Sequence, residues 1–250
     1  MTTILETQQL VKRFAGLTAT DKVSFSLQEG HIHALIGPNG AGKSTLIHQL
    51  CGNLLPTEGR IIFAGQDITR LAPAARVKLG LGRTFQVTSL LGEFTVRQNI
   101  AAAVQVRLGR NLRILDRMTA RHDVWEEADE LLGRSPLGKR ADIVVDDLSH
   151  GERKQLELLV SLAGRPKVLL LDEPMAGMNV EEKQDMSRFI MDVNDEFGTT
   201  IVLIEHDMGV VMDISDRVVV LDYGRKIGDG TPDEVRANED VIRAYLGAGH

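Results

Sequence analysis

The chain has 250 residues, 43% of them hydrophobic, and a formal net charge of −6 at pH 7. This size favours one large domain, or a domain with an insertion, and the acidic balance argues against nucleic acid as the main partner. Cys51 is the single cysteine, which excludes an intramolecular disulfide and a cysteine metal cluster. No apolar run approaches the ~20 residues that span a bilayer, and residues 1–10 lack a signal-peptide pattern. The chain is therefore expected to be soluble and cytoplasmic, with any membrane association made through a partner.

Residues 1–36 are predicted to form strands and turns. The segment Val23–Leu27 alternates apolar and polar residues, which is typical of a half-buried strand. The run Ile32–Ile36 is apolar apart from one histidine and is expected to be a strand as well. Phe14 stands alone upstream, so its ring is either a core side chain or a platform on which an adenine stacks.

A glycine-rich loop follows this strand and is the strongest motif of the chain. It fits the pattern of Gly, four residues and Gly-Lys-Ser, and consists of Gly37, Pro38, Asn39, Gly40, Ala41, Gly42, Lys43, Ser44 and Thr45. Glycines let the backbone curl around a phosphate, and N–H groups of the loop and of the next helix point at the anion. Lys43 is predicted to reach the β- and γ-phosphates, and Ser44 to hold Mg²⁺. Because a strand pattern precedes this loop and a helix pattern follows it, we predict a nucleotide-binding site.

The predicted secondary structure changes from strands to helices in the next part of the chain. From about residue 88 to 165, helical patterns replace strand patterns, which indicates a helical insertion into an α/β core. Thr95 and Gln98 fit a capping box that opens a helix, and a second helical stripe ends at Gly133. Residues 105–122 are basic and form either a solvated helix face or a docking surface.

A second capping box, made by Ser149 and Glu152, opens the last helix of this insertion. Its structural interpretation is a well-capped helix. Its functional interpretation is a second anion site, because a helix N-terminus with a hydroxyl and Gly151 beside it favours a bound anion. One chain needs only one triphosphate site, so this second site requires an explanation.

Two further strands end in chemically active residues. The run Val168–Leu171 fits a strand buried on both faces, and α/β sheets bind ligands at the end where Asp172 and Glu173 follow. Asp172 is predicted to bind Mg²⁺, directly or through water, and Glu173 to orient or deprotonate the attacking water. His206 follows the next apolar strand, Thr200–Ile204, and is either structural or a sensor of the γ-phosphate or the water.

Together these motifs resemble those of the ATP-binding-cassette (ABC) ATPase family, and the resemblance covers nearly the whole chain. The matches are the phosphate loop at Gly37–Thr45, the Q-loop at Gln86, the signature motif at Leu148–Glu152, the Walker B strand at Val168–Glu173, the D-loop at Met175–Glu181 and the switch histidine at His206. Phe14 matches the position of the adenine-stacking aromatic residue. His150 and Glu152 stand where Gly and Gln are commonest in the signature motif, and Asn179 replaces the usual D-loop Asp.

The resemblance implies an α/β fold: a P-loop NTPase (RecA-like) core with an N-terminal antiparallel β subdomain and an inserted α-helical subdomain. Residues 1–87 and 166–250 are expected to form the core with its β subdomain, and about 88–165 the helical subdomain that carries the signature motif. ATP and Mg²⁺ are the implied ligands. The implied catalytic residues are Glu173, His206 and Gln86, and the implied metal contacts are Ser44, Gln86 and Asp172.

In this family two subunits pack head to tail, which explains the second anion site. Ser149, His150 and Gly151 of one subunit are then expected to contact the ATP held by the other. The resemblance further implies two integral membrane permease subunits and, indirectly, a periplasmic substrate-binding protein. The chain is thus expected at the inner face of the cell membrane, without a nucleic-acid partner.

Three segments, Arg83–Gln86, Ile204–Met208 and Leu221–Ile227, are similar to the ATP-binding subunits of branched-chain amino acid uptake transporters. The expected function is therefore ATP hydrolysis that powers uptake of branched-chain amino acids or related small substrates. The alternatives are uptake of urea, short amides or aromatic acids, lipopolysaccharide-type export, a soluble ABC protein of DNA repair or translation, and a small-molecule kinase.

Overall fold

The computed structural model describes residues 2–84, 90–109 and 122–247, so the predicted site residue Gln86 lies outside the described residues. The chain divides into two units. The core unit comprises residues 1–83, 167–173 and 191–250, and the helical unit comprises residues 84–166 and 174–190. The subdomain boundaries expected from the sequence, 88–165 for the helical part, stay a prediction.

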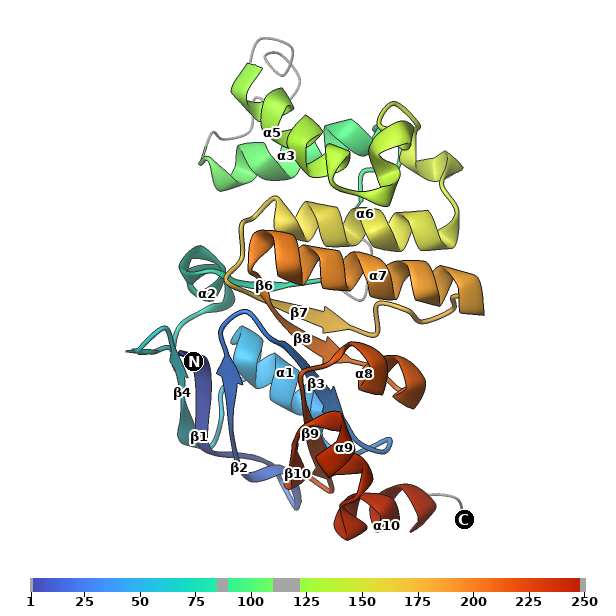
Figure 1. Ribbon diagram of the computed structural model, residues 1–250. Helices are drawn as coiled ribbons and strands as arrows, with labels where there is room; N and C mark the ends of the chain where they lie inside the picture. Colours follow the sequence, from blue (N-terminus) through green and yellow to red (C-terminus); the bar gives the residue numbers. More distant parts are fainter. Residues whose placement is uncertain (1, 85–89, 110–121, 248–250) are drawn as a thin grey trace. The chain divides into compact units, whose positions relative to one another are not determined.

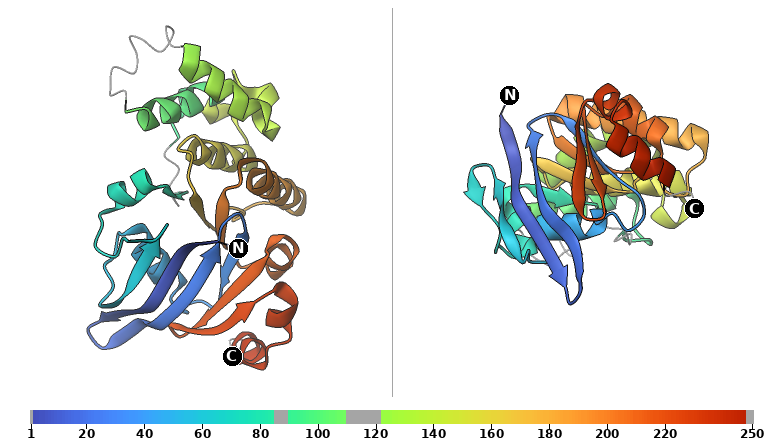
Figure 2. Two further views of the ribbon diagram at one scale, coloured as in Figure 1. Left: turned by 60° about the vertical axis from the view of Figure 1, so that its left-hand side comes forward. Right: turned by 90° about the horizontal axis from the view of Figure 1, so that it is seen from below.

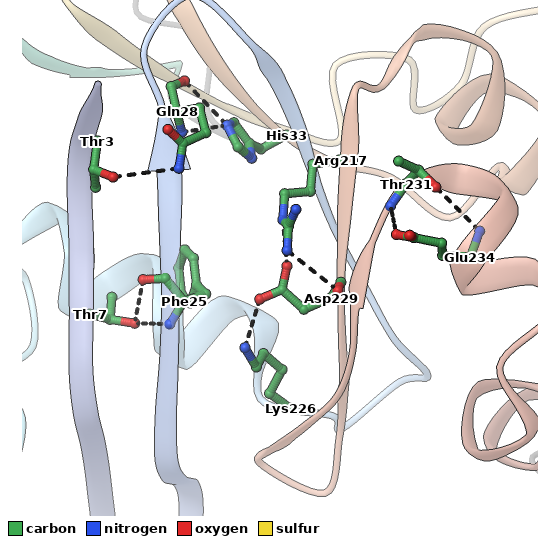
Figure 3. Close-up of polar contacts among 10 residues, drawn as sticks. All are labelled: Thr3, Thr7, Phe25, Gln28, His33, Arg217, Lys226, Asp229, Thr231 and Glu234. Carbon is green, nitrogen blue, oxygen red and sulfur yellow. Dashed lines mark hydrogen bonds and ion pairs between the residues drawn. The ribbon is translucent and has the colours of Figure 1, made fainter. Parts of the chain in front are cut away.

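The core unit contains an antiparallel sheet in the order β2-β1-β4-β5. Its strands are β1 (Thr3–Phe14), β2 (Leu17–Gln28), β4 (Glu58–Phe63) and β5 (Gln66–Asp67). Figure 2 shows the two long strands β1 and β2 side by side. Thr7 Oγ1 joins them, because it accepts the Phe25 N–H at 3.0 Å and donates to the Phe25 carbonyl at 3.4 Å (Figure 3).

A second sheet of the core unit has the order β10-β9-β3-β8-β7-β6. Its strands are β3 (Ile32–Ile36), β6 (Leu81–Arg83), β7 (Val168–Asp172), β8 (Thr200–Ile204), β9 (Arg217–Asp222) and β10 (Arg225–Gly230). All neighbours are parallel except β9 and β10, which form a hairpin. Parallel strands leave their carboxyl ends at one edge, so the segments that follow β3, β7 and β8 start there.

Helix α1 (Lys43–Cys51) shares one apolar core with both sheets (Figure 1). Leu46, Ile47 and Leu50 of α1 belong to the same buried cluster as Leu5 of β1 and Leu170 of β7. Each fully buried side chain of this kind stabilises the fold by about 1.5–3 kcal/mol. The phosphate loop therefore leads into a helix that is fixed from two sides.

The C-terminal end of α1 is held by a buried arginine. Arg76, on α2 (Pro73–Leu79), is only 1% exposed. Its guanidinium donates to the carbonyls of Gln49 at 2.7 Å and Leu50 at 2.6 Å, and also to those of Thr69 and Leu71. A cation at the negative end of the helix dipole satisfies the carbonyls that a helix leaves unpaired there.

The other face of the parallel sheet carries a smaller cluster that includes Ala34 and Ile36 of β3. Three helices contribute to it: α8 (Met208–Ile214), α9 (Pro232–Arg236) and α10 (Glu239–Gly247). Thr231 and Glu234 form a capping box at the start of α9 (Figure 3).

The helical unit contains α3 (Val96–Arg107), α5 (His122–Gly133), the 3₁₀ turns η2 (Pro136–Arg140) and η3 (Val145–Asp147), and α6 (His150–Leu162). Helix α7 (Val180–Phe197) starts in this unit and ends in the core unit. The capping boxes predicted at Thr95 and Ser149 are both present. No helix among the described residues is long and apolar enough to cross a membrane.

Candidate nucleotide-binding site

The loop between β3 and α1 has the backbone that its glycines allow. Gly42 has φ +98°, and a Cβ built there would lie 2.3 Å from the Ala19 carbonyl oxygen. Gly37 has φ +151°, and its Cβ would lie 2.1 Å from the Leu221 carbonyl oxygen. A side chain at either position would force the loop away from its neighbours, so both glycines are required by close packing as well as by conformation.

Lys43 is the first residue of α1 and is 7% exposed. Its ammonium donates to the loop carbonyls of Gly37 at 2.6 Å and Pro38 at 3.1 Å. Burial lowers the pKa of Lys43, while the negative charges of Glu173 and Asp172 act in the opposite direction. The lysine is thus held at the centre of the loop, near two carboxylates.

The loop lines a cavity of about 370 Å³ within the core unit. The lining residues are Leu17, Thr18, Ala19, Asn39, Gly40, Ala41, Gly42, Lys43, Ser44, Thr45, Glu173, His206, Tyr223 and Gly224. The structure thus brings together seven of the nine predicted loop residues, the predicted catalytic carboxylate and the predicted histidine. The lining combines Lys43 and the glycines of the loop with apolar side chains such as Leu17, which suits an anionic ligand that also has an apolar part.

Glu173 and His206 meet in this cavity. His206 Nε2 lies 2.6 Å from Glu173 Oε1, and both side chains are partly exposed. The Glu173 N–H donates to the Ile204 carbonyl at 2.9 Å, which fixes the turn after β7 against the end of β8. Glu173 also has φ +51°, a left-handed conformation that costs a non-glycine residue roughly 1–3 kcal/mol. Strain of this kind is concentrated at functional sites.

The site offers Mg²⁺ fewer protein ligands than the ion needs, as expected for a metal that also binds phosphates. Ser44 is exposed at the start of α1, and Asp172 ends β7. The described residues contain no group of three or more His, Cys, Asp or Glu that could hold a metal ion alone. Mg²⁺ in phosphate sites usually takes one or two protein ligands and completes its shell with phosphate and water. The hydroxyl and the carboxylate are therefore chemically adequate contacts.

The second predicted anion site lies at the start of α6, in the helical unit. Ser149 Oγ accepts the Glu152 N–H at 3.2 Å, and Glu152 Oε2 accepts the Ser149 N–H at 2.9 Å. Arg140 binds Glu152 through two hydrogen bonds of 2.8 and 3.0 Å, and these lower the pKa of Glu152. Because Ser149 Oγ accepts the backbone bond, its hydroxyl hydrogen remains available to an anion.

His150 makes a contact that the sequence did not suggest. Its Nε2 lies 3.0 Å from the Ala176 carbonyl oxygen, in the predicted D-loop, and beside Gly177. Both partners belong to the helical unit. The ring is therefore tied to the D-loop of its own chain at the position where a glycine is commonest in the signature motif.

Five lining residues were not predicted as site residues from the sequence: Leu17, Thr18, Ala19, Tyr223 and Gly224. Tyr223 and Gly224 form the two-residue turn of the β9–β10 hairpin, with φ of +42° and +78°. The Gly224 N–H donates to the Ala41 carbonyl at 2.9 Å, so this turn packs on the phosphate loop, and Tyr223 is 85% exposed. In the sequence, the Tyr-Gly pair indicates a turn but does not indicate which segment that turn contacts.

Phe14 lies at the end of β1, with Lys12 Nζ 5.2 Å from the centre of its ring. Among the described residues, Leu17, Thr18 and Ala19 line the cavity on this side, and Phe14 does not. Its stacking on adenine stays a prediction. The Q-loop assignment of Gln86 also stays a prediction, since that residue is outside the described part.

The strand–loop–helix motif, with a carboxylate and an imidazole at adjacent strand ends, defines a P-loop nucleotide-binding protein. Residues 20–176 match the family described as ABC transporter, and residues 225–250 match a family described as branched-chain amino acid ATP-binding cassette transporter. The chain belongs to the ATP-binding-cassette family of ABC transporters. The predicted α/β cassette fold is thereby confirmed.

Individual relatives cover nearly the whole chain. The high-affinity branched-chain amino acid transport ATP-binding protein LivG of Salmonella typhimurium is 38% identical over 98% of both chains. The lipopolysaccharide export system ATP-binding protein LptB of Haemophilus influenzae is 32% identical over 98% of this chain and 97% of its own. An ATP-binding cassette of an ABC transporter, solved in its ADP conformation, is 31% identical with a TM-score of 0.85, covering 99% of this chain and 100% of that one.

Proposed function

We propose that this chain is the ATP-binding and ATP-hydrolysing subunit of an ABC importer for branched-chain amino acids or related small substrates. The observation that carries the proposal is the contact between Glu173 and His206, 2.6 Å apart, in a cavity lined by the phosphate loop. This contact supports the proposal because a carboxylate and an imidazole share one cavity with the loop that would hold the phosphates of ATP.

The phosphate loop binds and orients the triphosphate. The N–H groups of the loop and the N-terminus of α1 point at the anion, and Lys43 transfers its hydrogen bonds from the carbonyls of Gly37 and Pro38 to phosphate oxygens. Ser44, Asp172 and Gln86 are the proposed contacts of Mg²⁺. When bound, Mg²⁺ would neutralise phosphate charge.

Glu173 and His206 act on the attacking water. The imidazole Nε2–H donates to Glu173 Oε1, which holds the carboxylate in one orientation. The second carboxylate oxygen can then accept a hydrogen of the water and align its oxygen with the γ-phosphorus. In this proposal Glu173 receives the proton of the water, and His206 senses the water through the carboxylate that it orients.

The active form is proposed to be a dimer with a second copy of this chain or with a paralogue. The start of α6 supports this, because the outward hydroxyl of Ser149 and the N–H groups of His150 and Gly151 form an anion site away from the phosphate loop in sequence. These residues would contact the ATP bound by the partner subunit. ATP then joins the two subunits and hydrolysis releases them.

The remaining partners follow from the family. We place the chain on the inner face of the cell membrane, bound to two integral membrane permease subunits that receive substrate from a periplasmic binding protein. The match of residues 225–250 to a branched-chain amino acid family and the 38% identity to LivG favour import. Export of lipopolysaccharide is the second candidate, supported by a lower identity of 32% to LptB.

The test uses the purified chain and its Glu173→Gln variant. The wild type is expected to release phosphate from ATP, while the variant binds ATP, loses nearly all turnover and elutes as an ATP-dependent dimer in size-exclusion chromatography. Normal hydrolysis by the variant would remove Glu173 from the mechanism. Transport is tested separately: loss of labelled leucine uptake on gene deletion supports import, whereas lipopolysaccharide retention supports the export candidate.

A further inference from the structure

An ion pair joins the ends of strands β6 and β7. Arg83 Nη2 donates to Asp172 Oδ2 at 2.8 Å. In the parallel pairing of these strands Arg83 lies opposite Leu170, two residues before Asp172. Because side chains two residues apart point to the same face of a sheet, Arg83 and Asp172 share the face that carries α1.

Both charged groups are largely withdrawn from solvent. The Arg83 and Asp172 side chains are 12% and 8% exposed. A carboxylate buried to this degree requires a cation, since an unpaired buried charge is strongly destabilising. The ammonium of Lys43 is near, but it bonds to the carbonyls of Gly37 and Pro38. Within residues 2–84, 90–109 and 122–247, Arg83 is therefore the cation in direct contact with Asp172.

Among the described residues, Asp172 is the acidic side chain that pairs with Arg83. Burial raises the pKa of the Cys51 thiol at the end of α1 to about 11, while the positive charge of Arg83 acts in the opposite direction. That thiol is neutral at pH 7 and adds no negative charge. Arg83 Nε is buried without a hydrogen-bond partner in the part of the chain that the structure describes.

We infer that Arg83 is a positioning residue that neutralises Asp172 when no metal is bound and competes with Mg²⁺ for that carboxylate when nucleotide binds. The inference rests on the proposed function, because it takes Asp172 as the metal contact. The guanidinium stabilises the fold around the buried carboxylate, at the expense of metal affinity.

The first experiment measures the pair without any ligand. Arg83→Met is expected to lower the melting temperature in EDTA by about 5–10 °C, because it leaves the Asp172 charge buried and unpaired. The double variant Arg83→Met with Asp172→Asn is expected to recover most of that loss. Equal melting temperatures of the single and double variants would show that the two charges are not coupled.

The second experiment measures the metal. A non-hydrolysable ATP analogue is titrated by calorimetry in EDTA and in saturating Mg²⁺, and the ratio of the two Kd values gives the Mg²⁺-dependent gain in affinity. Arg83→Met is expected to raise this ratio roughly tenfold, since removing a positive charge beside Asp172 favours the metal. Arg83→Lys keeps the charge and should stay within about threefold of the wild type.

The outcomes separate this inference from the function on which it rests. If the wild type binds no analogue with or without Mg²⁺, the proposed function fails. If the wild type shows the gain and Arg83→Met shows the same or a smaller one, competition with the metal is wrong while the function stands. If Arg83→Met lowers the melting temperature by the same amount in EDTA and in Mg²⁺ with the analogue, the ion pair is structural only and competition with the metal is again wrong.

Discussion

His206 Nε2 and Glu173 Oε1 lie 2.6 Å apart, although 33 residues separate them along the chain. They meet because β7 and β8 are adjacent parallel strands, so that the segments after Asp172 and Ile204 begin at one edge of the sheet. The backbone bond from the Glu173 N–H to the Ile204 carbonyl fixes the same junction. The contact between the two side chains therefore depends on the pairing of β7 with β8.

This contact predicts the effect of His206→Ala on hydrolysis. Loss of the imidazole leaves Glu173 without its orienting donor, so turnover should fall about 10²–10⁴-fold. ATP affinity should stay within about threefold of the wild type, because the phosphate loop is unchanged. Phosphate release and calorimetric titration measure the two quantities. His206→Gln keeps an amide donor and should retain more activity than alanine; equal activity of both variants would contradict an orienting role.

The contact of His150 with the Ala176 carbonyl predicts a defect that depends on the dimer. His150→Ala removes one hydrogen bond between the signature helix and the D-loop, worth about 1 kcal/mol, so turnover should fall roughly fivefold. ATP binding by the isolated subunit should not change, because this residue acts on the partner's nucleotide in the proposed dimer.

The control for His150 is His150→Gln, whose amide can still donate to Ala176. It should hydrolyse ATP faster than the alanine variant when both are assayed at protein concentrations that favour the dimer. If His150→Ala also weakens ATP binding by monomers, the residue acts within its own subunit and the proposed role is wrong.

Much of the site was predictable from local sequence, because the phosphate loop and the capping boxes are written in consecutive residues. The loop from Gly37 and the box at Ser149 both have the predicted form. The partners of Arg83 and Tyr223 were not predictable. Arg83 meets Asp172 only because β6 lies beside β7, and Tyr223 reaches the cavity only because Gly224 bonds to Ala41. Strand order and hairpin placement are tertiary information that no local pattern contains.

Arg76 predicts a stability effect centred on α1. Arg76→Met removes the guanidinium donor from the carbonyls of Gln49, Leu50, Thr69 and Leu71, which should cost roughly 2–4 kcal/mol of unfolding free energy. Urea denaturation followed by circular dichroism measures this loss. Arg76→Lys keeps the charge but reaches fewer carbonyls. Its unfolding free energy should therefore lie between those of the wild type and the methionine variant. A methionine variant as stable as the wild type would show that water replaces the guanidinium at no cost.

Buried His33 predicts how stability depends on pH. Its Nε2 accepts the Gln28 N–H at 2.9 Å (Figure 3), and burial lowers the pKa of His33 from 6.5 to about 4. Between pH 6.5 and 4, the unfolded chain therefore binds a proton at His33 that the folded chain does not bind. The stability due to neutral His33 is complete above pH 6.5 and is lost as pH falls towards 4, by up to about 3 kcal/mol of unfolding free energy. His33→Gln keeps an acceptor for the Gln28 N–H without a titrating ring. Urea midpoints between pH 4.5 and 7 should thus vary less for this variant than for the wild type, and parallel curves would exclude His33 as the source of the acid sensitivity.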